Sequence, residues 1–190
     1  AADGESYNIC IGYQAGSDMV AGGCDHNVII GDSAGTGGSA AMASCIAIGS
    51  NAMNATAGNA QTGTIAIGYN SLTNMTTGDG NTCVGYYAGY ANVYGEYNTA
   101  VGYEAYFNGA PSDTNGGNTC IGYQSGKFLT TGTSNTFVGI QSGLGITGTK
   151  LTGSNNTSIG QYSGGLLQGA ANSNVFLGAL AGNTTTTGVE

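Results

Sequence analysis

Two short motifs in this sequence match frames that carry chemistry in other proteins. Gly31-Asp32-Ser33-Ala34-Gly35 fits the Gly-x-Ser-x-Gly frame of a serine nucleophile on a strand-to-helix turn, and His26 lies close by in the sequence. Residues 143–148 read Gly-Leu-Gly-Ile-Thr-Gly and fit the Gly-x-Gly-x-x-Gly frame that holds a phosphate at a helix N-terminus. The first motif would support hydrolysis, and the second would support nucleotide binding.

The surrounding sequence favours a simpler interpretation of both motifs. The frame of the first recurs at residues 12–16 and 122–126, where glutamine stands in place of the central serine. With 37 glycines in 190 residues a chance match to the second frame is expected, and no helical pattern follows either motif. One histidine and scattered acids form no convergent constellation, so we expect no enzyme activity and no cofactor.

Cysteines and aspartates show no metal-binding pattern. The five cysteines include no Cys-x-x-Cys pair and no Cys/His spacing, so we predict no metal site. A disulfide between Cys24 and Cys45 stays open, without support from their spacing. Asp18, Asp79 and Asp113 do not recur at a fixed step, which argues against a calcium-binding roll and leaves only isolated sites open.

Tyrosines are stronger candidates for a binding surface. One interpretation is a ladder of rings that pack coil upon coil, and the other is a set of exposed rings that stack on sugars or anchor a protein partner. The receptor-binding candidates follow a recurring glycine in five copies of a repeat: Tyr13, Tyr69, Tyr86, Tyr103 and Tyr123.

A row of threonines suggests a different function. A flat, evenly spaced threonine face is the arrangement with which β-solenoid ice-binding proteins imitate a water lattice. The same repeat position holds isoleucine or valine in the other copies, which favours an inward or interface position and leaves ice binding as an alternative. The row consists of Thr82, Thr99, Thr119, Thr136 and Thr157.

All of these residues belong to one repeat that fills the chain. Its step of 17 to 21 residues is typical of a solenoid, so we predict a single β-solenoid array of about ten coils over residues 1–190. An aliphatic residue stands one before each anchor glycine and a β-branched residue three before it, which predicts a short strand. The anchors are Gly12, Gly31, Gly49, Gly68, Gly85, Gly102, Gly122, Gly139, Gly160 and Gly178.

Three further positions of the repeat predict how each coil is built. Asparagine stands four before the anchor in eight copies, which predicts a hydrogen-bonded ladder between coils. Alanine or serine stands three after it, which indicates a crowded place, and the anchor itself suits a bend. A second glycine seven before several anchors predicts a shorter extended segment on the opposite side. At about 4.8 Å per strand, ten coils make a rod of roughly 50 Å.

The strand is apolar on both faces, which indicates a partner. The residue two before the anchor points opposite to its neighbours, and a thin solenoid buries only one face, so we expect this position to meet other subunits. A closed ring of three is the symmetry we expect for a rod. The residues concerned are Cys10, Ile29, Ala47, Ala66, Cys83, Ala100, Cys120, Phe137, Ser158 and Phe176.

Charge and hydropathy exclude other classes of partner. The formal charge is −8, with two basic residues among 190, so no basic patch can neutralise a nucleic-acid backbone. The sequence contains no run of about 18 apolar residues, so we expect no membrane insertion.

The repeats resemble two known families of surface fibres. Residues 44–52 and 64–71 look like the Ala-Ile-Gly-x-x-Ala head repeat of trimeric autotransporter adhesins. Residues 98–105 and 135–139 are similar to the Asn-Thr-Ala-Val-Gly-Tyr-x-Ala repeats of phage tail-fibre-like proteins. The resemblance implies a left-handed, homotrimeric β-roll displayed outside the cell, on a virion or a cell surface. The step here is longer than in the adhesin heads, and the chain shows no stalk, anchor or chaperone domain.

These observations lead to one main expectation. We predict an all-β, parallel β-solenoid that serves as the shaft or head of a viral tail fibre or fibrous adhesin, with itself and a surface glycan or protein receptor as partners. A self-assembling extracellular filament subunit and an ice-binding β-solenoid are the alternatives.

Overall fold

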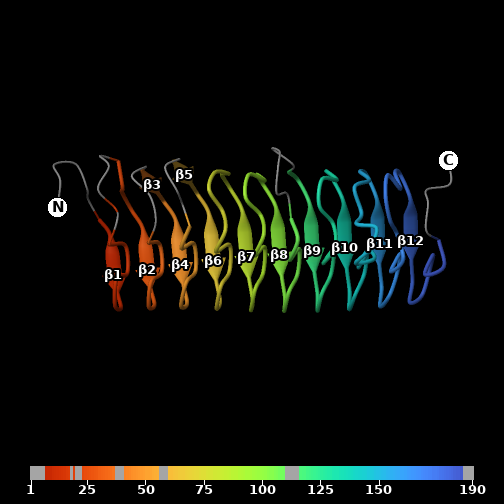
Figure 1. Cartoon of the computed structure of the whole chain (residues 1–190), viewed down its shortest axis with the longest axis horizontal. Helices are drawn as coiled ribbons and strands as arrows, with labels where there is room; N and C mark the ends of the chain where they lie inside the picture. The colour runs from red at the N-terminus through yellow and green to blue at the C-terminus, as the bar shows by residue number, and fades with distance from the viewer. Residues whose placement is uncertain are drawn as a thin grey trace.

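The chain folds as a column of stacked, flattened coils, seen in a computed structural model (Figure 1). The structure describes residues 7–17, 19, 23–36, 41–55, 60–109 and 116–185. Ten strands of three residues each form one parallel sheet, in which every strand neighbours the next copy of the repeat. They are β1 (Ile9–Ile11), β2 (Val28–Ile30), β4 (Ile46–Ile48), β6 (Ile65–Ile67), β7 (Thr82–Val84), β8 (Thr99–Val101), β9 (Thr119–Ile121), β10 (Thr136–Val138), β11 (Thr157–Ile159) and β12 (Val175–Leu177).

The register of this sheet follows the anchor glycines. The aliphatic residue before each anchor pairs with its counterpart in the next strand, as Ile67 does with Val84 and Val101 with Ile121. Loops of different length therefore do not shift the pairing. The predicted all-β parallel solenoid, with a step near 18 residues and its aliphatic residues in register, is confirmed.

A shorter extended segment lies before the main strand in several coils. Strand β3 (Met42–Ala43) pairs in parallel with β5 (Gln61–Thr62), and Leu151 forms parallel bridges with Leu129 and Gly169. The connections that carry β3 and β5 run along the upper edge of the column in Figure 1. The expected second segment is thus present in these coils.

The face of the strands that fills the core is the opposite of the predicted one. The middle residue of a strand points into its own coil, and Ile29, Cys83 and Phe137 are all 0% exposed. The two flanking residues point outward, and Ile121 and Ile159 are 38% and 39% exposed. The prediction that the middle residues meet other subunits is therefore wrong. A three-residue strand offers one side chain to one face and two to the other, and the narrow coil has room for the single one.

Size matching across each coil explains how the core is filled. In seven coils the residue six after the middle residue is glycine, and a Cβ at Gly35 would lie 2.9 Å from Ile29 Cδ1. In the other three coils the middle residue is alanine and its partner is a large, fully buried side chain. The two positions share one enclosed volume in each coil, so a large residue at one position goes with a small residue at the other, as close packing requires. The three pairs are Ala47 with Met53, Ala66 with Leu72, and Ala100 with Tyr106.

An asparagine ladder joins the coils inside the column. The Oδ1 of Asn118 accepts hydrogen bonds from the backbone N (3.0 Å) and the Nδ2 (3.1 Å) of Asn135, while its Nδ2 donates to Gly132 O at 2.9 Å. The same side-chain bonds recur from Asn81 to Asn174. They satisfy buried groups that would otherwise be costly. The predicted ladder is confirmed.

The ladder continues in altered form where asparagine is missing. Cys45 Sγ donates to Gln61 O at 3.5 Å, and Thr64 Oγ1 donates to Gly78 O at 3.4 Å. Both carbonyls lie seven residues before the next anchor, at the position that Gly132 has for Asn118. The acceptor is therefore kept while the donor changes to a weaker group.

The anchor glycines allow the coils to approach closely. Gly31 has a φ of 139°, and a Cβ there would lie 2.5 Å from Gly49 O. No other residue fits both the conformation and the space. The small residue three positions later is also buried, as predicted, and Ser125 Oγ donates to Phe137 O at 2.9 Å.

Candidate functional site: the strand face and the tyrosine ladder

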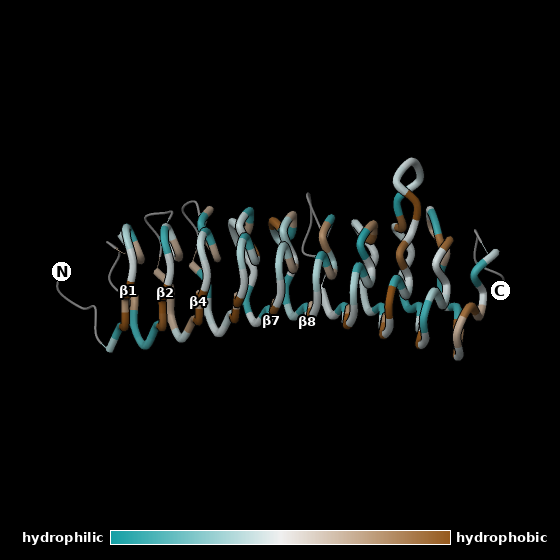
Figure 2. Tube along the Cα trace, turned by 90° about the horizontal axis from the view of Figure 1, so that it is seen from below, coloured by the Kyte–Doolittle hydropathy of each residue, from teal (hydrophilic) through white to brown (hydrophobic). Residues whose placement is uncertain are grey.

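The outward side of the ten-stranded sheet is a continuous uncharged surface of aliphatic and threonine side chains, which we call the strand face. It consists of the residues one and three before each anchor glycine, and it carries no charged side chain. Apolar segments recur at the labelled strands along the column in Figure 2. Its members are Ile9, Ile11, Val28, Ile30, Ile46, Ile48, Ile65, Ile67, Thr82, Val84, Thr99, Val101, Thr119, Ile121, Thr136, Val138, Thr157, Ile159, Val175 and Leu177.

The dimensions of the strand face follow from sheet geometry. Nine strand spacings give a length of about 43 Å, and two rows of side chains give a width of about 10 Å, so its footprint is about 400 Å². This is within the size of the largest apolar patch on a typical soluble monomer, which is often a functional surface. The side chains stand in register on short strands held by the anchors and the asparagine ladder, so the face is rigid and repeats at every coil.

The predicted threonine row lies on this strand face. Thr82, Thr99, Thr119, Thr136 and Thr157 pair directly with one another in β7 to β11 and are partly exposed. Of the two positions that the sequence favoured, the inward one is therefore wrong, and the interface position stays a prediction. The threonines line one half of the face, and Val84, Val101, Ile121, Val138 and Ile159 line the other.

Four of the five predicted tyrosines stack into a ladder just beyond the strand face. The ring centroids of Tyr69 and Tyr86 lie 5.3 Å apart, those of Tyr86 and Tyr103 5.1 Å, and those of Tyr103 and Tyr123 5.5 Å. The angles between the ring planes are 18°, 6° and 18°. Tyr13 lies outside this stack, because Asp32 and Ser50 occupy its position in the next two coils. We call Tyr69, Tyr86, Tyr103 and Tyr123 the tyrosine ladder.

The stacking decides which part of each ring a ligand can reach. The ladder tyrosines are 43% to 46% exposed, but the neighbouring rings cover the faces of Tyr86 and Tyr103. These rings therefore present edges and hydroxyls to solvent. Desolvation, with smaller contributions from Tyr87 and Tyr103, raises the pKa of Tyr86, so its phenol stays neutral at physiological pH. Sugar stacking on open ring faces, part of the predicted binding role, therefore does not fit Tyr86 and Tyr103, which stack on a tyrosine on both sides.

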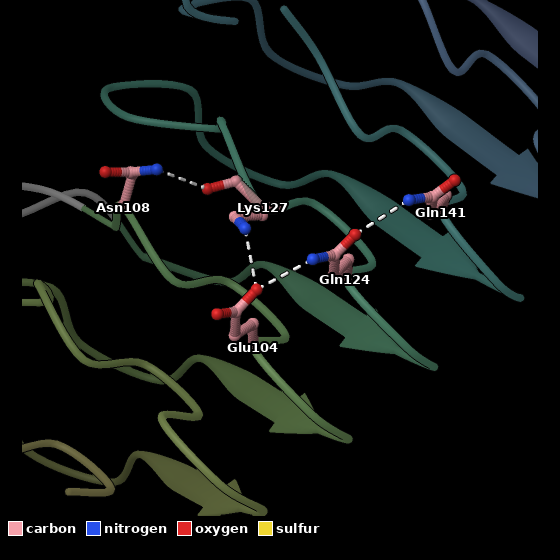
Figure 3. Close-up of polar contacts among 5 residues, drawn as sticks. All are labelled: Glu104, Asn108, Gln124, Lys127 and Gln141. Atoms are coloured by element: carbon pink, nitrogen blue, oxygen red, sulfur yellow. Dashed lines mark hydrogen bonds and ion pairs between the residues drawn. The ribbon is translucent and has the colours of Figure 1, made fainter. Parts of the chain in front are cut away.

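A polar cluster that the sequence did not reveal continues this edge of the column (Figure 3). Glu104 Oε2 accepts from Lys127 Nζ at 2.6 Å and from Gln124 Nε2 at 2.7 Å, and Gln124 Oε1 accepts from Gln141 Nε2 at 2.7 Å. Partial burial acts to raise the pKa of Glu104, but these hydrogen bonds and the charge of Lys127 outweigh it and lower the pKa. Glu104, Gln124 and Gln141 each stand two after an anchor glycine. This shared repeat position is the sequence signal that could have predicted the cluster.

Aromatic rings hold the lysine of this cluster in place. Lys127 Nζ lies 5.6 Å from the ring centroids of both Phe107 and Phe128. Phe107 in turn stacks on Tyr90 at 5.1 Å, which connects the cluster to the aromatic surface beside the ladder. The arrangement is a cation held between two rings and a carboxylate, which orders the turn.

The two motifs that match the nucleophile and phosphate-binding frames lie in turns of the column. Ser33 occupies a tight turn with a φ of 52°, equivalent to Gln14 and Asn51 in neighbouring coils, and its backbone N donates to Tyr13 O. His26 stacks on Tyr7 with ring centroids 5.0 Å apart. Residues 143–148 form an irregular spacer that no helix follows in the described part of the chain.

The cysteines and aspartates also have structural positions. All five cysteines are free thiols, so the structure contains no bond between Cys24 and Cys45, and Cys10 alone is exposed. Burial raises the pKa of Cys83 to about 12. Asp79 Oδ1 accepts from Thr62 N at 2.7 Å, whereas Asp18 and Asp113 lie outside the described residues. Among the residues described, no group of three or more His, Cys, Asp or Glu side chains is placed to hold a metal ion.

In the part of the chain that the structure covers, no helix has the length and hydropathy needed to cross a membrane. Comparison of the chain with protein-family models, with curated proteins and with solved structures found no match.

Proposed function

We propose that this chain is the shaft or head segment of a homotrimeric surface fibre, in which the strand faces of three copies meet along a common axis. The observation that carries the proposal is the uncharged, in-register strand face on the outside of the coil. The resemblance of the repeats to tail-fibre and adhesin repeats supports the same assembly and a left-handed coil. The fibre would be extracellular, on a virion or a cell surface.

The shape of the strand face favours three copies over two. Each face is only about 10 Å wide and straight along its length, so three of them close into a triangular prism with an interior of aliphatic and threonine side chains.

The distribution of charge allows such an assembly. The chain has a formal charge of −8, so three copies repel one another unless their acids lie away from the shared surface. The described acids Asp25, Asp32, Asp79, Glu96 and Glu104 all lie outside the strand face. Burial of the face therefore desolvates no carboxylate.

Attachment is the role we propose for the opposite and lateral surfaces. The tyrosine ladder and the loops between coils stay exposed when the strand faces are buried. Tyr69 and Tyr123 stand at the two ends of the ladder, where each stacks on one other ladder tyrosine, and Tyr13 is 74% exposed. These rings are the points where a surface glycan or protein receptor would make contact.

The mass in solution tests the proposal. Light scattering on the purified chain should give about three times 18.7 kDa at micromolar concentration. Val101→Asp places a carboxylate at the middle of the strand face and should give monomers with an unchanged β-type circular dichroism spectrum. Leu166→Asp is the matched control, because Leu166 is 39% exposed and lies outside the strand face.

Three results would decide against the trimer. A monomeric mass for the unchanged chain would remove it, and so would an unchanged mass for Val101→Asp. A mass that grows without limit as concentration rises would favour the filament alternative, in which the unpaired edges of β1 and β12 stack end to end.

Ice binding is a second candidate, because the threonine row faces outward. Threonines spaced by about 4.8 Å along five coils form a flat, regular array of hydroxyl and methyl groups. The two candidates exclude each other, since a buried strand face cannot meet ice. Monomeric protein that inhibits ice recrystallisation, and loses this activity in Thr119→Lys, would favour the second candidate. Monomeric protein that does not inhibit ice recrystallisation would count against it.

A further inference from the structure

The tyrosine ladder places identical phenols directly above one another. Each stacked pair comes from the same position of successive coils, and the Tyr86 and Tyr103 rings are within 6° of parallel at 5.1 Å. Side chains at equivalent positions with parallel rings bring equivalent atoms together. The carbons next to the two hydroxyls therefore face each other across the gap between coils.

The ladder is also open to reagents. Its four rings are 43% to 46% exposed, so a small oxidant or an enzyme that generates radicals can reach them. Other exposed tyrosines lack this arrangement. Tyr13 and Tyr97 are more exposed, at 74% and 66%, and neither takes part in a stacked tyrosine pair among the described residues.

We propose that the tyrosine ladder is a site of oxidative cross-linking, where a peroxidase with hydrogen peroxide joins successive coils through dityrosine bonds. Two phenols each give one electron and one proton to the oxidant, which reduces one hydrogen peroxide. The two radicals couple through the carbons next to their hydroxyls. Each of these carbons then loses its hydrogen to restore the aromatic ring, and the hydroxyls are regained. In sum, two tyrosines and one hydrogen peroxide give one dityrosine and two waters.

Such a bond would act as a staple along the column. Each coil of a solenoid is held only by its neighbours, so coils can separate locally without unfolding the rest. A bond between Tyr86 and Tyr103 closes a loop of 17 residues and ties two coils together. Covalent closure of this kind restricts the unfolded chain and raises resistance to unstacking. A fibre exposed outside the cell would gain durability.

The purified full chain, treated with a plant peroxidase and hydrogen peroxide, tests the proposal. Dityrosine fluorescence should appear, and the product should run near 18.7 kDa on a denaturing gel, because the bonds lie within one chain. Peptide mapping should place them between Tyr86 and a ladder neighbour or between Tyr103 and Tyr123. This readout does not depend on whether the chain is a trimer, so its failure is distinct from failure of the proposed function.

Two double variants supply the control. Tyr86→Phe with Tyr103→Phe keeps ring packing but removes every stacked tyrosine pair, and it should lose more than half of the fluorescence. Tyr13→Phe with Tyr97→Phe removes the same number of more exposed tyrosines and should leave the yield nearly unchanged. Equal losses in the two variants would overturn the proposal. Bonds that map to Tyr13 or Tyr97, or products that appear only as cross-linked chains, would overturn it as well.

Discussion

Replacing Asn118 by alanine should destabilise the column far more than a typical loss of one side-chain hydrogen bond. Asn118 Nδ2 donates to Gly132 O, and its Oδ1 accepts from the backbone N of Asn135, both in the buried interior. Truncation removes the partner of a buried carbonyl and of a buried amide at the same time. The Asn118 backbone N keeps its bond to Asn98 Oδ1 at 3.0 Å, so the damage is confined to the following coil.

The magnitude follows from the cost of leaving buried polar groups unsatisfied. Each such group costs about 1–3 kcal/mol, so two of them predict a loss of about 2–6 kcal/mol. The matched control is Asn108→Ala, because the half-buried Asn108 donates one bond, to Lys127 O at 2.9 Å. This change should cost about 0.5–1.5 kcal/mol. The expected difference is a large share of the roughly 5–15 kcal/mol that stabilises an ordinary domain.

Urea unfolding monitored by circular dichroism gives the free energies, and hydrogen exchange locates the damage. The backbone amide of Asn135 should lose protection in Asn118→Ala and keep it in Asn108→Ala, because coils depend mainly on their neighbours. An Asn118→Ala variant that costs no more than Asn108→Ala would show that the ladder accompanies the stacking without stabilising it.

The remaining predictions concern the glycine anchors, the thiols and the polar cluster. Gly122→Ala should destabilise by about 1–3 kcal/mol more than Gly178→Ala in urea unfolding, because both have positive φ but only Gly122 meets the backbone of the next coil. A thiol reagent should modify Cys10 in the native chain and reach Cys83 only after denaturation, as mass spectrometry would show. The lowered pKa of Glu104 predicts stability that is present above the ordinary carboxyl pKa and is lost as pH falls through the lowered value. Urea midpoints between about pH 6 and about pH 2 should therefore fall less in Glu104→Gln.

The period of the fold could be predicted from sequence because its physical requirements repeat. An anchor such as Gly31 must be glycine, because a Cβ there would lie 2.5 Å from the backbone of the next coil. An asparagine such as Asn135 can bond to the equivalent asparagine of the neighbouring coil, so the same residue recurs. These demands recur in every coil and leave the same residue types at the same step. Strand position, parallel pairing and register all follow from that alignment.

Which face of each strand points into the coil could not be predicted from the alternation of residues alone. Ile29 and Ile30 are equally apolar neighbours, so a period of two separates two faces without saying which one is inside. The decisive signal lies six residues away. Ala100 is followed by Tyr106 and Phe137 by Gly143, a size exchange that only two residues sharing one enclosed volume need to make. The polar cluster around Glu104 escaped notice because glutamate or glutamine occupies its repeat position in only four of the ten coils.

The variable core position and the uniform outward position together explain why the strand face is a better place to look for function than the core. The core position varies from alanine to phenylalanine across the coils, and a large residue stands six positions later only where the core residue is alanine. The position before the anchor is isoleucine, valine or leucine in all ten coils, although it lies on the outside and has no such partner within its own coil. An exposed position that faced only water would tolerate polar residues at little cost. Uniformity on the outside of a column is what a partner with the same repeat requires, and another copy of this chain has that repeat.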